Sequence, residues 1–290
     1  GGAISFTTQA LSYTVGTSPS AIALADFDRD GRLDLAVANS GSANVFLFRN
    51  QSVSGTIAFA FAQTLTVGTT PRSLAVGDFD QDSRIDLAVA NVGSNSVQVF
   101  RNTSVTGSIS LSLSTTLSGL STPTSLAIGD FNGDGFLDMS VANNLSGNNT
   151  VSVFKGVGVV GTISFTSLTV TTGASPLALA LADFDGNGYS DIVTANSASN
   201  TISVLQTSAT NSLSFTTKLD VSGLNSINTG GLAAGDLNGD GFPDIVTTTT
   251  GTTNNVAVLL QYQRLAQSLT ITTLSTTVST GISVTVARSI

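Results

Sequence analysis

The stretch DFDRDGRLD at residues 26–34 decides the fold, because it recurs four more times along the chain. The other copies are DFDQDSRID (78–86), DFNGDGFLD (130–138), DFDGNGYSD (183–191) and DLNGDGFPD (236–244). The first Asp residues of successive copies lie 52, 52, 53 and 53 residues apart. A fixed period of this size is typical of repeat architectures, in which each repeat forms one supersecondary unit.

Alternating small and apolar residues flank every copy, as at 21–25 before the first copy and 33–39 after it. A turn rich in Gly, Ser and Asn follows, and then come a third alternating run at 45–48 and a fourth at 57–61. Alternation with period two, together with abundant Val, Ile, Thr and Phe, favours strands, and helical spacing is not sustained anywhere. Each repeat is therefore predicted to form four short antiparallel strands.

Four strands in each repeat suit the blade of a propeller, so the predicted fold is an all-β β-propeller of four-stranded antiparallel blades, with five repeats visible. A β-sandwich or a linear β array is the alternative, but a sandwich gives no reason for five equal repeats. The propeller is expected to span 1–268, with one copy of the outer strand at 4–16. A second copy and a C-terminal strand occupy 269–290, where they either close the ring or dock on a partner and allow self-association.

The composition excludes several classes of function. His and Cys are absent, which rules out Ser-His-Asp triads, His- or thiolate-ligated zinc and cysteine nucleophiles. The two lysines, Lys155 and Lys218, fall in no recognisable motif. With a net charge of −8 and no basic stripe, the chain is a poor candidate for binding nucleic acid. No apolar run approaches the roughly 18 residues that span a bilayer, so no membrane span is expected.

The acidic residues are concentrated in the repeated windows. All 18 are Asp, and 17 of them lie in the five copies, with Asp220 the exception. One carboxylate outside the windows leaves no pair for glycoside hydrolysis, so we expect no enzyme. Crowded carboxylates repel one another unless a cation lies among them. The sequence therefore predicts a cation in each window.

The first window illustrates how a cation would be held. Positions 1, 3, 5 and 9 are Asp, Gly31 at position 6 permits a tight turn, and the carbonyl of Arg32 at position 7 can ligate. Ca²⁺ takes about six to eight oxygen ligands, whereas Mg²⁺ demands stricter octahedral geometry, so Ca²⁺ is favoured. The twelfth position is never Glu and no helices flank the windows, which excludes EF-hands. Asx turns without metal are the alternative, but such turns do not require four acids in nine residues.

Positions 1 and 9 are Asp in every copy, and positions 3 and 5 are Asp or Asn, so each offers an oxygen ligand. The predicted metal ligands are Asp26, Asp28, Asp30 and Asp34; Asp78, Asp80, Asp82 and Asp86; Asp130, Asn132, Asp134 and Asp138; Asp183, Asp185, Asn187 and Asp191; and Asp236, Asn238, Asp240 and Asp244. In the second copy Ser83 replaces the Gly of position 6, which is expected to strain that loop.

The pattern DxDxDGxxD, followed by an apolar strand ending near Asn39, Asn91, Asn143 or Asn196, resembles the FG-GAP/VCBS repeats. The best-known members of that family are the calcium-binding blades of integrin α-subunit propellers. The resemblance covers nearly the whole chain, and it implies one Ca²⁺ in each blade, up to five, in the loop between the first two strands. It also implies ligation by the carbonyls of Arg32, Arg84, Phe136, Tyr189 and Phe242.

Two features depart from the family pattern. Integrin-like propellers are seven-bladed, whereas this chain has five repeats, so the ring is either five-bladed or part of a larger assembly. The fifth repeat carries Leu237 and Thr249 in place of the usual Phe and Asn. The Phe at position 2 of the other copies is expected to pack between blades, and the Asn after the second strand is expected to be a turn or ladder residue. These Phe residues are Phe27, Phe79, Phe131 and Phe184.

These observations predict a non-catalytic, calcium-binding extracellular module with a structural, adhesive or assembly role. Extracellular calcium is near millimolar and would fill even weak sites, which favours an extracellular or cell-surface location. The expected partner is a protein or glycan ligand at the cell surface. A lectin-type propeller is the alternative, although Trp is absent and only three Tyr are available to stack on a sugar.

Overall fold

The computed structural model describes residues 11–208, 213–224, 227, 230–249, 255–262, 270–278 and 282–286, the last two ranges by their backbone. Over these residues the chain is all-β, with no helix, and so none that could cross a membrane. The strands form five antiparallel sheets in which each strand pairs with the next in sequence. The prediction of four antiparallel strands in each repeat is confirmed.

The first four sheets have four strands each, and the fifth has five. Their bounds are β1 (Pro19–Ala25), β2 (Asp34–Asn39), β3 (Asn44–Asn50) and β4 (Phe59–Thr66); β5 (Pro71–Gly77), β6 (Asp86–Asn91), β7 (Ser96–Asn102) and β8 (Leu111–Leu117); β9 (Pro123–Gly129), β10 (Asp138–Asn143), β11 (Thr150–Gly156) and β12 (Phe165–Thr171); β13 (Pro176–Ala182), β14 (Asp191–Asn196), β15 (Thr201–Thr207) and β16 (Phe215–Val221); and β17 (Leu232–Gly235), β18 (Asp244–Thr249), β19 (Asn255–Tyr262), β20 (Thr270–Val278) and β21 (Ile282–Val286).

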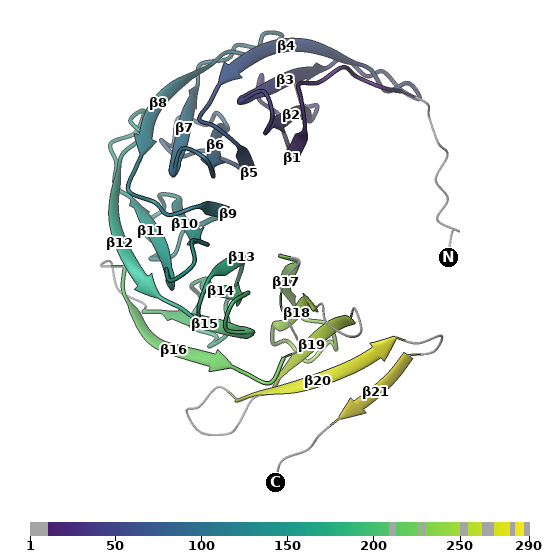
Figure 1. Ribbon diagram of the computed structural model, residues 1–290. Helices are drawn as coiled ribbons and strands as arrows, with labels where there is room; N and C mark the ends of the chain where they lie inside the picture. Colours follow the sequence, from purple (N-terminus) through teal and green to yellow (C-terminus); the bar gives the residue numbers. More distant parts are fainter. Residues whose placement is uncertain are drawn as a thin grey trace.

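The five sheets stand side by side in an arc around a common axis (Figure 1). The first strand of each sheet is innermost, and β4, β8, β12, β16 and β20 run along the outside (Figure 1). Neighbouring sheets meet through their first strands, since β5 contacts β1 and β9, and β13 contacts β9 and β17. Within the described chain the arc does not close, and β1 and β17 stand at its two ends (Figure 1).

The core lies between the sheets. One buried cluster joins Phe27 and Leu47 of the first repeat to Leu87 and Phe100 of the second. The other Phe residues at position 2 of the Asp loops pack in the same way, each against the next sheet: Phe79 contacts the ring of Phe165, Phe131 clusters with Ile192, and Phe184 clusters with Ile245. Their predicted role in packing between repeats is confirmed.

The outer strand was expected at both ends of the chain. At the C-terminal end, β20 pairs with β19 and takes the fourth position of the fifth sheet, and β21 adds a fifth strand beside it. At the N-terminal end, residues 11–16 of the predicted strand at 4–16 form no strand, and the remainder lies outside the described residues. Instead Tyr13 packs its ring on Phe48 and Phe59, and its hydroxyl oxygen accepts a hydrogen bond from the Phe59 backbone N–H at 3.1 Å.

Candidate metal sites

The five Asp loops connect the first and second strands of the five sheets, as predicted. The ninth-position Asp begins the second strand, and in the first sheet Asp34 pairs with Ala25 at the end of β1. Gly31 has a φ of 86°, a conformation that glycine adopts without strain, and it turns the chain back toward β2. Ser83 adopts the same left-handed conformation with a φ of 66°, so the second loop carries the strain that the sequence predicted.

Backbone N–H groups fix the first and ninth carboxylates of each loop. In the first loop, Asp26 accepts hydrogen bonds from the N–H groups of Asp30 at 3.0 Å and Gly31 at 2.8 Å. Asp34 accepts one from Phe27 at 2.9 Å and one from Asn50, near the end of β3, at 2.8 Å. Equivalent bonds to the ninth-position Asp recur in the other four loops. The carboxylates are thus oriented by the loop backbone and by the third strand.

The structure brings the first, third and ninth acids of a loop together. Ligand oxygens of Asp26, Asp28 and Asp34 lie within 4.8 Å of one another, and the same holds for two further groups. These are Asp78, Asp80 and Asp86, and Asp183, Asp185 and Asp191. In the third and fifth loops the third position is an amide, Asn132 or Asn238, so an oxygen ligand is retained at lower charge. Oxygen donors at this density are what a hard cation such as Ca²⁺ requires, so the donor set fits the ion.

Burial makes the ninth-position carboxylates costly without a cation. Asp34, Asp86, Asp138, Asp191 and Asp244 are all fully buried. Burial, with nearby carboxylates adding to it, raises the pKa of Asp86 to about 7 and the pKa of Asp191 to about 7. The same causes raise the pKa of Asp138 to about 6. A divalent cation among these groups would favour the charged form and offset the cost of burial.

The fifth-position residues behave differently from the other predicted ligands. Asp30 and Asp82 do not join the close groups of acids but pair with arginines, and Asp134 pairs with Lys155. Asn187 and Asp240 accept hydrogen bonds from the N–H groups of Tyr189 and Phe242. Ligation by the fifth-position side chains, and by the carbonyls of Arg32, Arg84, Phe136, Tyr189 and Phe242, stays a prediction.

Sequence reasoning missed the basic residues that reach into the loops from the third strand. Arg49 contacts Asp28 and Asp30, Arg101 contacts Asp80 and Asp82, and Lys155, which seemed to belong to no motif, contacts Asp134. Arg49 and Arg101 lie 52 residues apart, the same period as the loops, so this repetition could have revealed them.

The loops also contact the following sheet. Asn102 of the second sheet donates a hydrogen bond to the carbonyl of Phe27 in the first loop at 2.8 Å, and the N–H of Gly107 donates to Asp28 at 3.0 Å. Gln261 of the fifth sheet donates to the carbonyl of Phe184 in the fourth loop at 2.6 Å. The candidate metal sites therefore lie at the boundaries between neighbouring sheets.

The arrangement of these loops agrees with a comparison against known families. The sequence model of a family described as FG-GAP-like repeat matches residues 26–89, 78–141 and 183–247, which together make up more than half of the chain. The chain belongs to this family. Each matched FG-GAP-like stretch begins at the first Asp of one loop and extends into the second strand of the next repeat.

Individual relatives of these FG-GAP-like repeats are distant. Cartilage acidic protein 1 of Xenopus tropicalis is 29% identical over 143 residues, which cover 47% of this chain and 22% of that protein. The chain thus spans about a fifth of the length of that relative. A crystal structure of BBS1N in complex with ARL6DN, soaked with lead, has 11% identity and a TM-score of 0.39, covering 83% of this chain and 78% of the other. The V. cholerae biofilm matrix protein Bap1 has 14% identity and a TM-score of 0.45, covering 84% of this chain and 37% of the other.

Proposed function

We propose that the chain is a non-catalytic, calcium-binding β-propeller module that acts outside the cell in adhesion or assembly. The observation that carries this proposal is the grouping of carboxylate oxygens within 4.8 Å of one another in three of the repeated loops, each group including a fully buried ninth-position Asp. Membership of the FG-GAP-like repeat family supports both the calcium and the extracellular location. Filled loops would hold neighbouring sheets together and present the surface of the arc to a protein or glycan partner.

The propeller is supported by the two end faces of the arc. Ile22, Leu24 and Leu33 on the first sheet are 68%, 52% and 55% exposed, whereas their counterparts in the second sheet pack against the core between sheets one and two. These counterparts are Leu74, Val76 and Ile85. At the other end Leu237 is 57% exposed, although the Phe at this position is at most 3% exposed in the first four repeats. Both ends thus have the apolar surface of an inter-sheet contact, and further sheets of this kind would extend the arc toward a ring.

Replacing one ninth-position carboxylate tests the calcium proposal. Asp34→Asn is expected to reduce the number of calcium ions per chain from five to four, because it removes a charge and an oxygen ligand from the first loop. The other four sites should stay filled, because each repeat mainly contacts its neighbours. Native mass spectrometry in calcium-containing buffer gives the count. Asp220→Asn is the matched control, because Asp220 lies outside the loops and pairs with Lys218, and it should leave the count unchanged. Loss of all five ions in Asp34→Asn would contradict independent sites.

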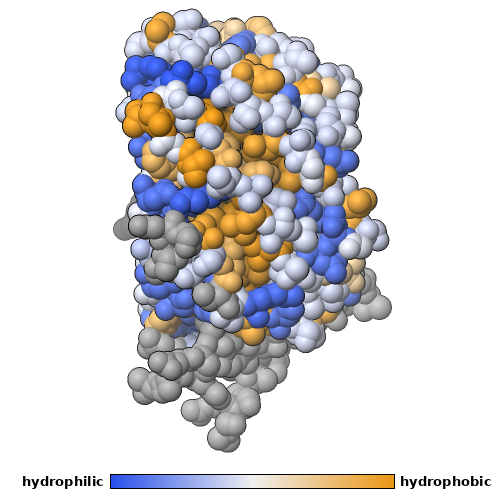
Figure 2. Space-filling view, turned by 90° about the vertical axis from the view of Figure 1, so that its left-hand side faces the viewer, coloured by the Kyte–Doolittle hydropathy of each residue, from blue (hydrophilic) through white to orange (hydrophobic). Residues whose placement is uncertain are grey.

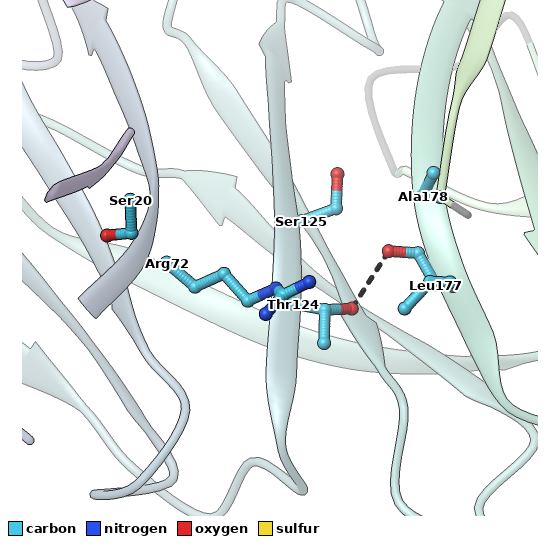
Figure 3. Close-up of a pocket in the computed structure, with 7 residues that line it drawn as sticks. Ser20, Arg72, Thr124, Ser125, Leu177 and Ala178 are labelled. Carbon is cyan, nitrogen blue, oxygen red and sulfur yellow. Dashed lines mark hydrogen bonds between the residues drawn. The ribbon is translucent and has the colours of Figure 1, made fainter. Parts of the chain in front are cut away.

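A second candidate function is the binding of an acidic sugar at the axis of the arc. A cavity of about 380 Å³ lies between the first strands, lined by Ser20, Arg72, Thr124, Ser125, Leu177, Ala178 and Gly230 (Figure 3). Figure 3 shows the side chain of Arg72 extending toward Thr124, which donates a hydrogen bond to the Leu177 carbonyl at 2.9 Å. Among the described residues no carboxylate pairs with Arg72. The Arg72 guanidinium lies among serine and threonine hydroxyls, and no aromatic residue lines the cavity. This lining favours a sugar that carries a carboxylate over a neutral sugar, which would need an aromatic ring to stack on.

Arg72→Gln tests this second candidate. The substitution is expected to weaken binding of uronic-acid glycans by about tenfold or more, because a charged hydrogen bond to a carboxylate is lost. A glycan array carrying matched acidic and neutral sugars gives the comparison. Arg29→Gln is the control, because Arg29 is an exposed arginine outside the cavity. Equal binding of acidic glycans by the native chain and Arg72→Gln would refute the candidate.

A further inference from the structure

A basic side chain reaches from the third strand into the Asp loop in three of the five repeats. Arg49 on β3 contacts Asp28 at 2.5 Å and Asp30 at 2.6 Å. Arg101 on β7 contacts Asp80 at 2.5 Å and Asp82 at 3.0 Å. Lys155 on β11 contacts Asp134 at 3.1 Å. Each of these carboxylates belongs to the predicted ligand set of its own loop.

The position of these residues is equivalent in all five repeats. Each immediately precedes the residue whose backbone N–H donates to the ninth-position Asp, as Arg49 precedes Asn50 and Arg101 precedes Asn102. In the third sheet that donor is Gly156, which follows Lys155. In the fourth and fifth sheets the donors are Thr207 and Gln261, so the equivalent residues are the uncharged Gln206 and Leu260.

The presence or absence of this basic residue gives the five loops different net charges. The first and second loops each contain four carboxylates and pair with two arginines, which leaves −2 when only paired basic residues are counted; the exposed Arg29 of the first loop forms no ion pair among the described residues. The third contains three carboxylates and pairs with Lys155, which also gives −2. The fourth and fifth contain three carboxylates each, and no basic residue in the described part of the chain pairs with them, which leaves −3.

We propose that Arg49, Arg101 and Lys155 are the residues that set calcium affinity, so that the chain has three weaker sites and two tighter ones. The inference rests on the proposed calcium binding and adds its regulation. In the first three repeats the cationic side chain shares carboxylate oxygens with the ion and repels it, and one Ca²⁺ neutralises the site. In the fourth and fifth loops nothing built into the described chain offsets the carboxylates, so those loops take up calcium first.

Isothermal titration of the full chain with CaCl₂ tests the division of sites. The native chain is expected to show two tight and three weaker sites. Arg49→Gln, which introduces the residue found at the equivalent position of the fourth sheet, is expected to raise the affinity of one weak site by about tenfold. The reciprocal Gln206→Arg is expected to lower the affinity of one tight site by a similar factor. Arg72→Gln removes an arginine away from the loops and should leave the isotherm unchanged.

The rise in melting temperature on adding calcium provides a second readout. It should be larger in Arg49→Gln than in the native chain, and smaller in Gln206→Arg. A fall in the affinity of the first loop in Arg49→Gln would show that Arg49 positions the ligands instead, and would overturn the inference, as would no change. If Arg49→Gln fails to fold, an unchanged isotherm in Gln206→Arg refutes the inference by itself. Five equal sites in the native chain overturn the tuning but leave calcium binding in place, whereas no binding at all overturns both.

Discussion

Chelation with EDTA is expected to lower the melting temperature of this chain by about 10 °C or more. At a calcium concentration about 100 times the dissociation constant, each site adds about 2.7 kcal/mol to the free energy of unfolding. For a domain of this size, 1 kcal/mol corresponds to about 2 °C. The apo loops also hold buried carboxylates such as Asp86, whose pKa is raised to about 7, so ion removal leaves a costly group in the core. Differential scanning calorimetry measures the shift.

Adding calcium back after EDTA distinguishes the loss of calcium from a general effect of the chelator on the melting temperature. Excess CaCl₂ should return the melting temperature to its starting value, while MgCl₂ at equal ionic strength should return it only in part, since Mg²⁺ requires stricter geometry. A melting curve unchanged by EDTA would refute the metal proposal for all five loops.

The second large effect is expected from Phe131→Ala. Phe131 follows the first Asp of the third loop, is fully buried, and packs with Leu179, Ile192 and Leu205 of the fourth repeat. Truncation leaves a cavity between two sheets and should lower the free energy of unfolding by about 4 kcal/mol. Urea denaturation monitored by circular dichroism gives the value.

Phe61→Ala is the matched control for that substitution. Phe61 lies on the outer strand β4 and is 57% exposed, so the same truncation should cost less than about 1 kcal/mol. On the side of the arc where β8 and β12 lie, the outer surface mixes hydrophobic and hydrophilic residues (Figure 2). Similar losses in the two variants would mean that the loop Phe residues do not hold neighbouring sheets together.

The strands and the loops could be predicted because both depend on local sequence. Period-two alternation predicted the antiparallel order, and the 52-residue spacing predicted that every loop lies at the same place in its sheet. Left-handed backbone at Gly31 and Ser83 follows from the turn that the ninth-position Asp requires. The strand pattern and the turns depend on residues fewer than ten positions apart, and the placement of the loops follows from the repeat itself.

The contacts of individual side chains depend on how strands pair, which the local pattern does not determine. The contact between Arg49 and Asp28 spans 21 residues and exists because the register of β3 on β2 places Arg49 beside the loop. An outer strand was predicted at 4–16 because Ile4–Val15 matches Ile57–Val67, but 11–16 form no strand and Tyr13 packs on Phe48 and Phe59 instead. Pattern similarity cannot reveal whether a neighbouring strand is present for a segment to pair with.

The hydrogen bonds that cross from the first, second and fourth loops to the next sheet have a mechanical consequence. Gln81 of the second loop donates to the carbonyl of Gly135 in the third at 2.7 Å, and the N–H of Gly161 in the third repeat donates to the carbonyl of Asp80 at 2.7 Å. The proposed ions therefore lie at the joints of the arc rather than inside its rigid segments. With calcium bound at the boundaries between sheets, the arc would resist bending as one rigid body. Without calcium, neighbouring sheets would move relative to one another. Calcium concentration would thus set the stiffness of the whole array, and with it the force that the array transmits from one end to the other.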